Sequence, residues 1–72
     1  MKYHIMDRSG HTTEVFDTAD KVSMEEAEKR FTELTGHGFR AAENKGGGKH
    51  EVVKSFNPDA EETIFVPLLA GG

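Results

Sequence analysis

The chain has 72 residues, no cysteine, and a formal charge of −4 from nine basic and thirteen acidic residues. This length allows one small domain with little room for an enclosed active site, and the lack of cysteine excludes disulfides, thiolate metal sites and a cysteine nucleophile. The acidic balance and the scattered basic residues argue against nucleic acid as a partner, and no stretch approaches the about 20 apolar residues of a membrane span. We therefore expect a cytoplasmic protein that binds neither nucleic acid nor membrane.

The first sixteen residues have the pattern of a β-hairpin. Tyr3 and Ile5 alternate with polar residues, and the run HTTEVF at 11–16 is rich in residues that favour strands. Between these runs, Asp7 can start a turn and Gly10 can adopt the positive φ that closes it. We expect two antiparallel strands here.

The stretch SMEEAEKRFTELTG, residues 23–36, has the pattern of an amphipathic helix. Ser23 can cap its start together with Glu26, and Gly36 can end it in the left-handed conformation. The apolar residues recur at spacings of three and four, which places them on one face that a sheet must cover. These residues are Met24, Ala27, Phe31 and Leu34.

Three further strands are expected after the helix. Two short strand patterns, GFRAAEN at 38–44 and HEVVKSF at 50–56, flank the glycine-rich segment KGGGK. The run TIFVPLL at 63–69 is apolar at both odd and even positions, which is typical of a central strand. Pro67 has no N–H, so we expect it where this strand leaves the sheet.

The resulting order of elements is strand, strand, helix, strand, strand, strand. One core closes if the last strand inserts beside the first, parallel to it, with the helix packed across one face. The sequence therefore predicts an α+β protein with the β-grasp fold, a mixed sheet with one packed helix. We expect residues 1–69 to form this single domain and residues 70–72 to form a flexible tail.

The final residues FVPLLAGG carry a more specific signal. Together with the order of elements and the helix at Ser23, they resemble ubiquitin and its relatives. The ending itself is similar to that of the prokaryotic sulfur carriers, in which an apolar strand runs through proline to Gly-Gly. The arginines that precede the two glycines in ubiquitin are missing, because Leu68, Leu69 and Ala70 stand in their place.

The resemblance implies a function for the tail. In this family an activating enzyme uses ATP to adenylate the terminal carboxylate, which here belongs to Gly72. Gly71, Ala70 and Leu69 would thread into that enzyme, and a Cβ at either of the last two positions, Gly71 or Gly72, would collide with the channel. The protein would be a substrate rather than an enzyme and would need no cofactor, because ATP is used by its partner.

Three functions remain open on the sequence. The first is a sulfur carrier with a thiocarboxylate at Gly72, which passes its sulfur to an acceptor enzyme. The second is a protein modifier that Gly72 joins to lysines of target proteins. The third is a β-grasp module that binds partners without covalent linkage. The amino-acid sequence of the tail favours the sulfur carrier.

A partner that holds the tail should also contact the strand before it. We assign this partner surface to Phe65 and Pro67, and we expect the apolar side chain of Phe65 to point away from the helix. The sequence is equally consistent with a Phe65 side chain that is covered by its neighbours. Alternation alone does not show which set of residues faces the helix.

Two other patterns are set aside. The segment GGGK lacks the spacing and the following Ser or Thr of a phosphate-binding loop. The four histidines, His4, His11, His37 and His50, have no spacing typical of a metal site, so we expect no bound metal.

Overall fold

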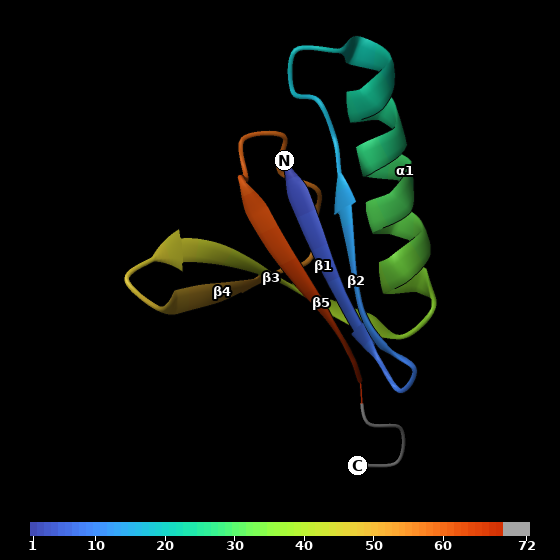
Figure 1. The fold of residues 1–72 in the computed structure, drawn as a ribbon, viewed down its shortest axis with the longest axis vertical. Helices are drawn as coiled ribbons and strands as arrows, with labels where there is room; N and C mark the ends of the chain where they lie inside the picture. The colour runs from blue at the N-terminus through green and yellow to red at the C-terminus, as the bar shows by residue number, and fades with distance from the viewer. Residues whose placement is uncertain (69–72) are drawn as a thin grey trace.

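The computed structural model describes residues 1–68 of the chain, which form one helix and five strands (Figure 1). The elements follow in the order β1 (Lys2–Asp7), β2 (Gly10–Val15), α1 (Lys21–Gly36), β3 (Phe39–Gly46), β4 (Lys49–Val53) and β5 (Glu62–Pro67). The protein is therefore a small α+β structure.

All five strands belong to one mixed sheet with the order β2-β1-β5-β3-β4. β5 pairs in parallel with β1, placing Ile64 beside His4, and antiparallel with β3, placing Ile64 beside Ala42. The expectation of a central last strand parallel to the first is confirmed. Both edges of the strand are hydrogen-bonded to neighbours, so it presents no unpaired edge.

The turn of the first hairpin follows the local chemistry of its residues. The Asp7 carboxylate accepts hydrogen bonds from the Ser9 N–H and hydroxyl, at 2.8 and 2.6 Å, and these bonds hold its pKa below the usual range. Gly10 closes the turn at a φ of 134°, a conformation that favours glycine. The predicted hairpin over residues 1–16 is confirmed.

The helix begins and ends at other residues than the sequence suggested. Its N-cap is Asp20, whose carboxylate accepts from the Val22 N–H at 3.0 Å, while the Ser23 hydroxyl accepts from the Asp17 N–H at 2.8 Å. Asp and Ser cap equally well, so the aspartate three positions earlier extends the helix by nearly one turn. At the other end, Gly36 is helical, and the left-handed residue is Gly38 with a φ of 90°.

The helix covers one face of the sheet, and the core lies between them. Tyr3 and Phe65 are the largest fully buried side chains, and their ring centroids are 4.8 Å apart. Phe31 on α1 meets Phe65 edge to face at 5.6 Å. The helical face predicted from the sequence is confirmed for Ala27, Phe31 and Leu34, whereas Met24 is only half-buried.

One charged residue is buried beside this core. Glu43 on β3 is 4% exposed, and its carboxylate accepts hydrogen bonds from Lys45 at 2.8 Å and from the Asn57 side chain at 3.2 Å. A buried carboxylate requires such partners. Glu43 therefore fastens the segment between β4 and β5 to the sheet.

Within residues 1–68, α1 is too short and too polar to cross a membrane.

Candidate partner surface where β5 ends

The two faces of β5 differ sharply in exposure. Thr63 and Phe65 point toward the helix and are buried, whereas Ile64 is half-buried and Val66 is 38% exposed on the opposite face. Phe65 is 0% exposed, so the expectation that it forms part of a partner surface is wrong. Its ring is a central part of the core instead.

The strand register explains the orientation of Phe65. In the sheet it lies between Ile5 on β1 and Ala41 on β3, and both of these residues are buried under the helix. Directly paired residues of neighbouring strands point to the same face. A shift of one residue would bury Val66 and expose the aromatic ring.

Pro67 is exposed, as a partner surface requires, and it is the last residue of β5. The Leu68 N–H still donates to the Gly38 carbonyl at 2.7 Å, which holds the backbone against the start of β3. The chain is thus tied to the sheet as far as residue 68. Leu69, Ala70, Gly71 and Gly72, which the sequence analysis assigned to the tail and to activation, lie outside the described residues.

The face of the sheet opposite the helix carries apolar side chains near the end of β5. Val66 and Leu68 continue the outward alternation of the strand, and Leu68 is 49% exposed. Val52 on β4 is 56% exposed and pairs with Ala42, which in turn pairs with Ile64. We call these five residues, from three neighbouring strands, the exit patch.

The exit patch was not identified from the sequence, although a signal for it was present. Ile64, Val66 and Leu68 are apolar like Phe65 and Pro67, so one set had to face solvent or a partner. Exposed apolar residues that cluster are typical of interaction surfaces. The exit patch, rather than Phe65, is the exposed apolar surface at the end of β5.

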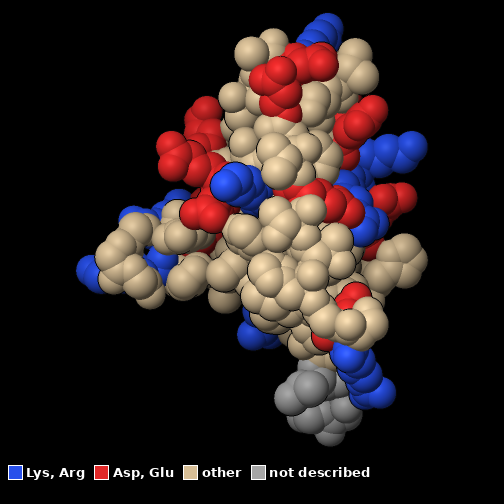
Figure 2. Space-filling model, in the orientation of Figure 1, with Lys and Arg blue, Asp and Glu red and all other residues tan. Residues whose placement is uncertain are grey.

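Charges are distributed unevenly around this surface. In Figure 2 most acidic side chains lie in the upper half of the view, and the part where β5 ends is mainly uncharged. Across the sheet, Val66 pairs with Arg40, an exposed residue of β3. A basic residue thus lies beside the apolar residues at the end of β5, in a chain with a net charge of −4.

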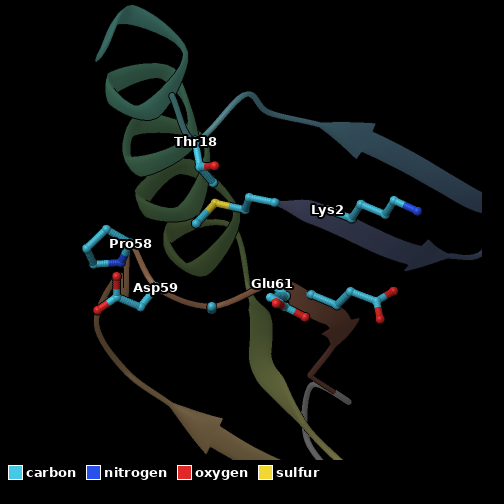
Figure 3. A pocket seen from close by; sticks show the side chains of 8 residues that line it. Lys2, Thr18, Pro58, Asp59 and Glu61 are labelled. Atoms are coloured by element: carbon cyan, nitrogen blue, oxygen red, sulfur yellow. The ribbon is translucent and has the colours of Figure 1, made fainter. Parts of the chain in front are cut away.

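A hollow lies at the other end of β5, where the strand begins. It has a volume of about 580 Å³ and is lined by Met1, Lys2, Thr18 and residues 58–62. Figure 3 shows that the labelled Lys2 and Asp59 side chains extend away from each other. The lining offers carboxylates without a convergent acid, base or nucleophile, so we assign no chemistry to it.

Two histidines form a polar network on the helix-free face. His4 Nε2 lies 2.9 Å from a Glu62 carboxylate oxygen, and His4 Nδ1 lies 3.3 Å from the Thr13 hydroxyl, which also contacts His11 at 3.2 Å. The hydrogen bond from His4 lowers the pKa of Glu62. In the described part of the chain, no three His, Asp or Glu side chains come together as metal ligands.

No protein-family model, no curated protein and no solved structure matches this chain.

Proposed function

We propose that the protein has the β-grasp fold and presents its C-terminal Ala70-Gly71-Gly72 segment to an adenylating enzyme in the cytoplasm. The product is a sulfur carrier with a thiocarboxylate at Gly72. The protein itself is the substrate of this reaction. It binds no cofactor, because its partner uses the ATP.

The observation that carries this proposal is the way in which β5 leads to the tail. β5 is the central strand, parallel to β1, and it ends at Pro67 one residue before the backbone bond from Leu68 to Gly38. A residue anchored in the middle of a sheet provides a rigid base for whatever follows it. The exit patch beside this base offers an apolar surface that the same partner can contact.

The proposed chemistry needs only the terminal carboxylate from this chain. A Gly72 carboxylate oxygen attacks the α-phosphorus of ATP, and pyrophosphate leaves. A hydrosulfide ion then attacks the acyl-adenylate carbonyl, AMP leaves, and the thiocarboxylate remains at Gly72. Bare glycine backbone suits a narrow channel because it carries no Cβ, and the activating enzyme supplies the catalytic groups.

The second candidate is a protein modifier, in which a target lysine attacks the activated Gly72 carbonyl in place of the sulfur donor. Both functions share the adenylation step, so their products distinguish them. A carrier gains the mass of sulfur in exchange for oxygen at Gly72, whereas a modifier appears in heavier, lysine-linked species. A noncovalent module would give neither product.

The decisive experiment measures ATP–pyrophosphate exchange by the cognate activating enzyme. The parent protein, a Gly72 deletion and Gly71→Val are compared, after mass spectrometry of the endogenous protein has established that Gly72 is its last residue. The deletion moves the carboxylate back by about 3.3–3.6 Å, and a misplacement of about 1 Å can cost about a hundredfold in rate. We expect exchange with the parent alone.

Substitution in the body of the protein supplies the control. Val15→Thr changes an exposed residue on the edge strand β2, far from the end of β5, and should leave exchange unchanged. Equal exchange from the parent and both tail variants, all melting at the same temperature, would refute activation through the diglycine.

A further inference from the structure

A groove lies at the edge of β3, where β4 stops covering it. It has a volume of about 310 Å³, near the lower end of the range for ligand sites, and its surface is mainly apolar. Its lining comes from the end of α1, the start of β3, the end of β4 and Leu68. The residues are Thr35, Phe39, Arg40, Ala41, Val52, Val53, Lys54 and Leu68.

The groove exposes part of a strand edge. β4 pairs with β3 only from the pair Val53–Ala41 onward, so Phe39 has a neighbouring strand on the β5 side alone. In an antiparallel pair, successive residues direct their N–H and C=O groups to opposite sides. The bond from Leu68 to the Gly38 carbonyl shows that Gly38 faces β5, so the backbone groups of Phe39 face the groove.

The charge of the groove is opposite to that of the whole protein. Arg40 and Lys54 are exposed, and they are the charged residues among those that line it. Neither forms an ion pair with any residue from 1 to 68. The whole chain carries four more acidic than basic residues, so the positive charge of this groove is a local feature.

We propose that this groove binds an extended segment of a partner protein in which apolar and acidic residues alternate. An apolar side chain of the segment packs against Phe39 and Val53, which lie on the same face of the sheet as the buried Ala41. Its acidic side chains pair with Arg40 and Lys54, and its backbone hydrogen-bonds to Phe39, which extends the sheet by β-strand addition. The binding is noncovalent and does not depend on activation of the tail.

An extended segment fits this site better than a helix does. Within residues 1–68 the N–H and C=O of Phe39 have no strand partner on the groove side, so another extended backbone can pair with them, whereas a helix has already used its own backbone groups. An alternating segment matches the groove because the two faces of an added strand meet different residues. One face meets the apolar Phe39 and Val53, and the other meets the cations Arg40 and Lys54. The two cations select against a basic segment.

The test uses the ¹⁵N-labelled protein and two synthetic eight-residue peptides. The first alternates leucine with glutamate, and the second alternates leucine with lysine. We expect the first peptide alone to shift the amide signals of Phe39, Lys54 and Leu68 saturably, and to leave those of Thr13 and Val15 on the far edge strand unchanged. Shifts centred on β2, or equal binding of both peptides, would overturn the proposal.

Variants of the two cations make the test specific. Exposed ion pairs are worth little individually, so Arg40→Ala and Lys54→Ala should each weaken binding of the glutamate peptide roughly two- to fivefold. The double variant Arg40→Glu/Lys54→Glu should prefer the lysine peptide instead. Arg8→Glu, in the exposed turn between β1 and β2, is the matched control and should behave like the parent.

Two other occupants would be recognised in the same spectra. Shifts at the groove that grow with protein concentration, without any peptide, would mean that a second copy of the chain fills it. If deletion of residues 69–72 shifts the amide signals of the groove relative to the parent protein, without any peptide, the chain's own end fills the groove. Either result would overturn the proposal, and ATP–pyrophosphate exchange, measured separately, tests tail activation without reference to the groove.

Discussion

The Tyr3 hydroxyl on β1 donates a hydrogen bond of 2.8 Å to the Ala27 carbonyl in the middle of α1. Both residues are buried, with Tyr3 at 1% exposure. This bond therefore joins the first strand to the helix through the centre of the core, and it fixes how the helix lies across the sheet.

Tyr3→Phe should destabilise the protein by about 1 kcal/mol, the net value of a typical hydrogen bond. The ring stays in contact with Phe16 and Phe65, so packing is retained. Urea unfolding with an unchanged m-value measures the loss. A variant as stable as the parent would show that the hydroxyl contributes nothing to folding.

The same hydroxyl should make the protein sensitive to alkaline pH. Burial raises the pKa of Tyr3, and the negative charges of Glu14 and Glu28 raise it further. Because the folded pKa lies above the unfolded value of about 10, this stabilisation is complete below pH 10 and is lost as the pH rises toward the folded value. Stability should therefore fall above pH 10.

Absorbance near 295 nm measures this effect directly, since Tyr3 is the single tyrosine and there is no tryptophan. We expect tyrosinate to appear together with the loss of helical circular dichroism. Tyr3→Phe is the control and should lose less stability over the same pH interval. Tyrosinate formation at pH 10 in a fully folded chain would contradict the burial of the hydroxyl.

Adjacent residues of β5 should respond very differently to substitution. Phe65→Ala removes a ring that is 0% exposed and should cost about 3–5 kcal/mol, comparable to the whole stability of so small a domain. The variant should be unfolded at room temperature. Val66→Thr, on the exposed face, should change the free energy of unfolding by at most about 0.5 kcal/mol.

Thermal melts followed by circular dichroism separate these two outcomes. A cooperative melt of Phe65→Ala within a few degrees of the parent would mean that the register of β5 is shifted by one residue. In that case Val66→Thr would become the damaging substitution.

The start of the helix can be tested with two alanine substitutions. Asp20→Ala removes the cap that accepts from Val22 and should cost about 1 kcal/mol. Ser23→Ala removes the acceptor for the exposed Asp17 N–H and should cost less than half as much. Urea unfolding of both variants decides between the two starts, because a helix that began at Ser23 would reverse the order.

The sequence was sufficient where only one arrangement satisfies a pattern. Ala27, Phe31 and Leu34 share one helical face and no other face is apolar, so the buried side of α1 followed from spacing alone. The central position of β5 followed because residues 63–69 are apolar at odd and even positions alike. Both features come from local periodicity, which does not depend on the rest of the fold.

Prediction failed where two local choices are equivalent. Phe65 and Val66 are both apolar, and only pairing with Ile5 and Ala41, distant in sequence, decides which one is buried. Asp20 and Ser23 are both good caps, and the choice depends on Asp17 using the serine hydroxyl. The groove beside Phe39 has no local signal, because it arises from where β4 stops along β3.

The parallel pairing of β1 with β5 also determines when the protein can fold. His4 and Glu62 meet although they are 58 positions apart, and β5 separates the β1–β2 hairpin from the β3–β4 hairpin in the sheet. A nascent chain that has emerged only as far as β4 therefore has two hairpins that are not yet joined in one sheet. Such distant pairing slows folding, because a large loop must close before its contacts form. Until β5 is synthesised, Tyr3, Ile5 and Phe31 lack the ring of Phe65, beside which all three lie in the folded protein.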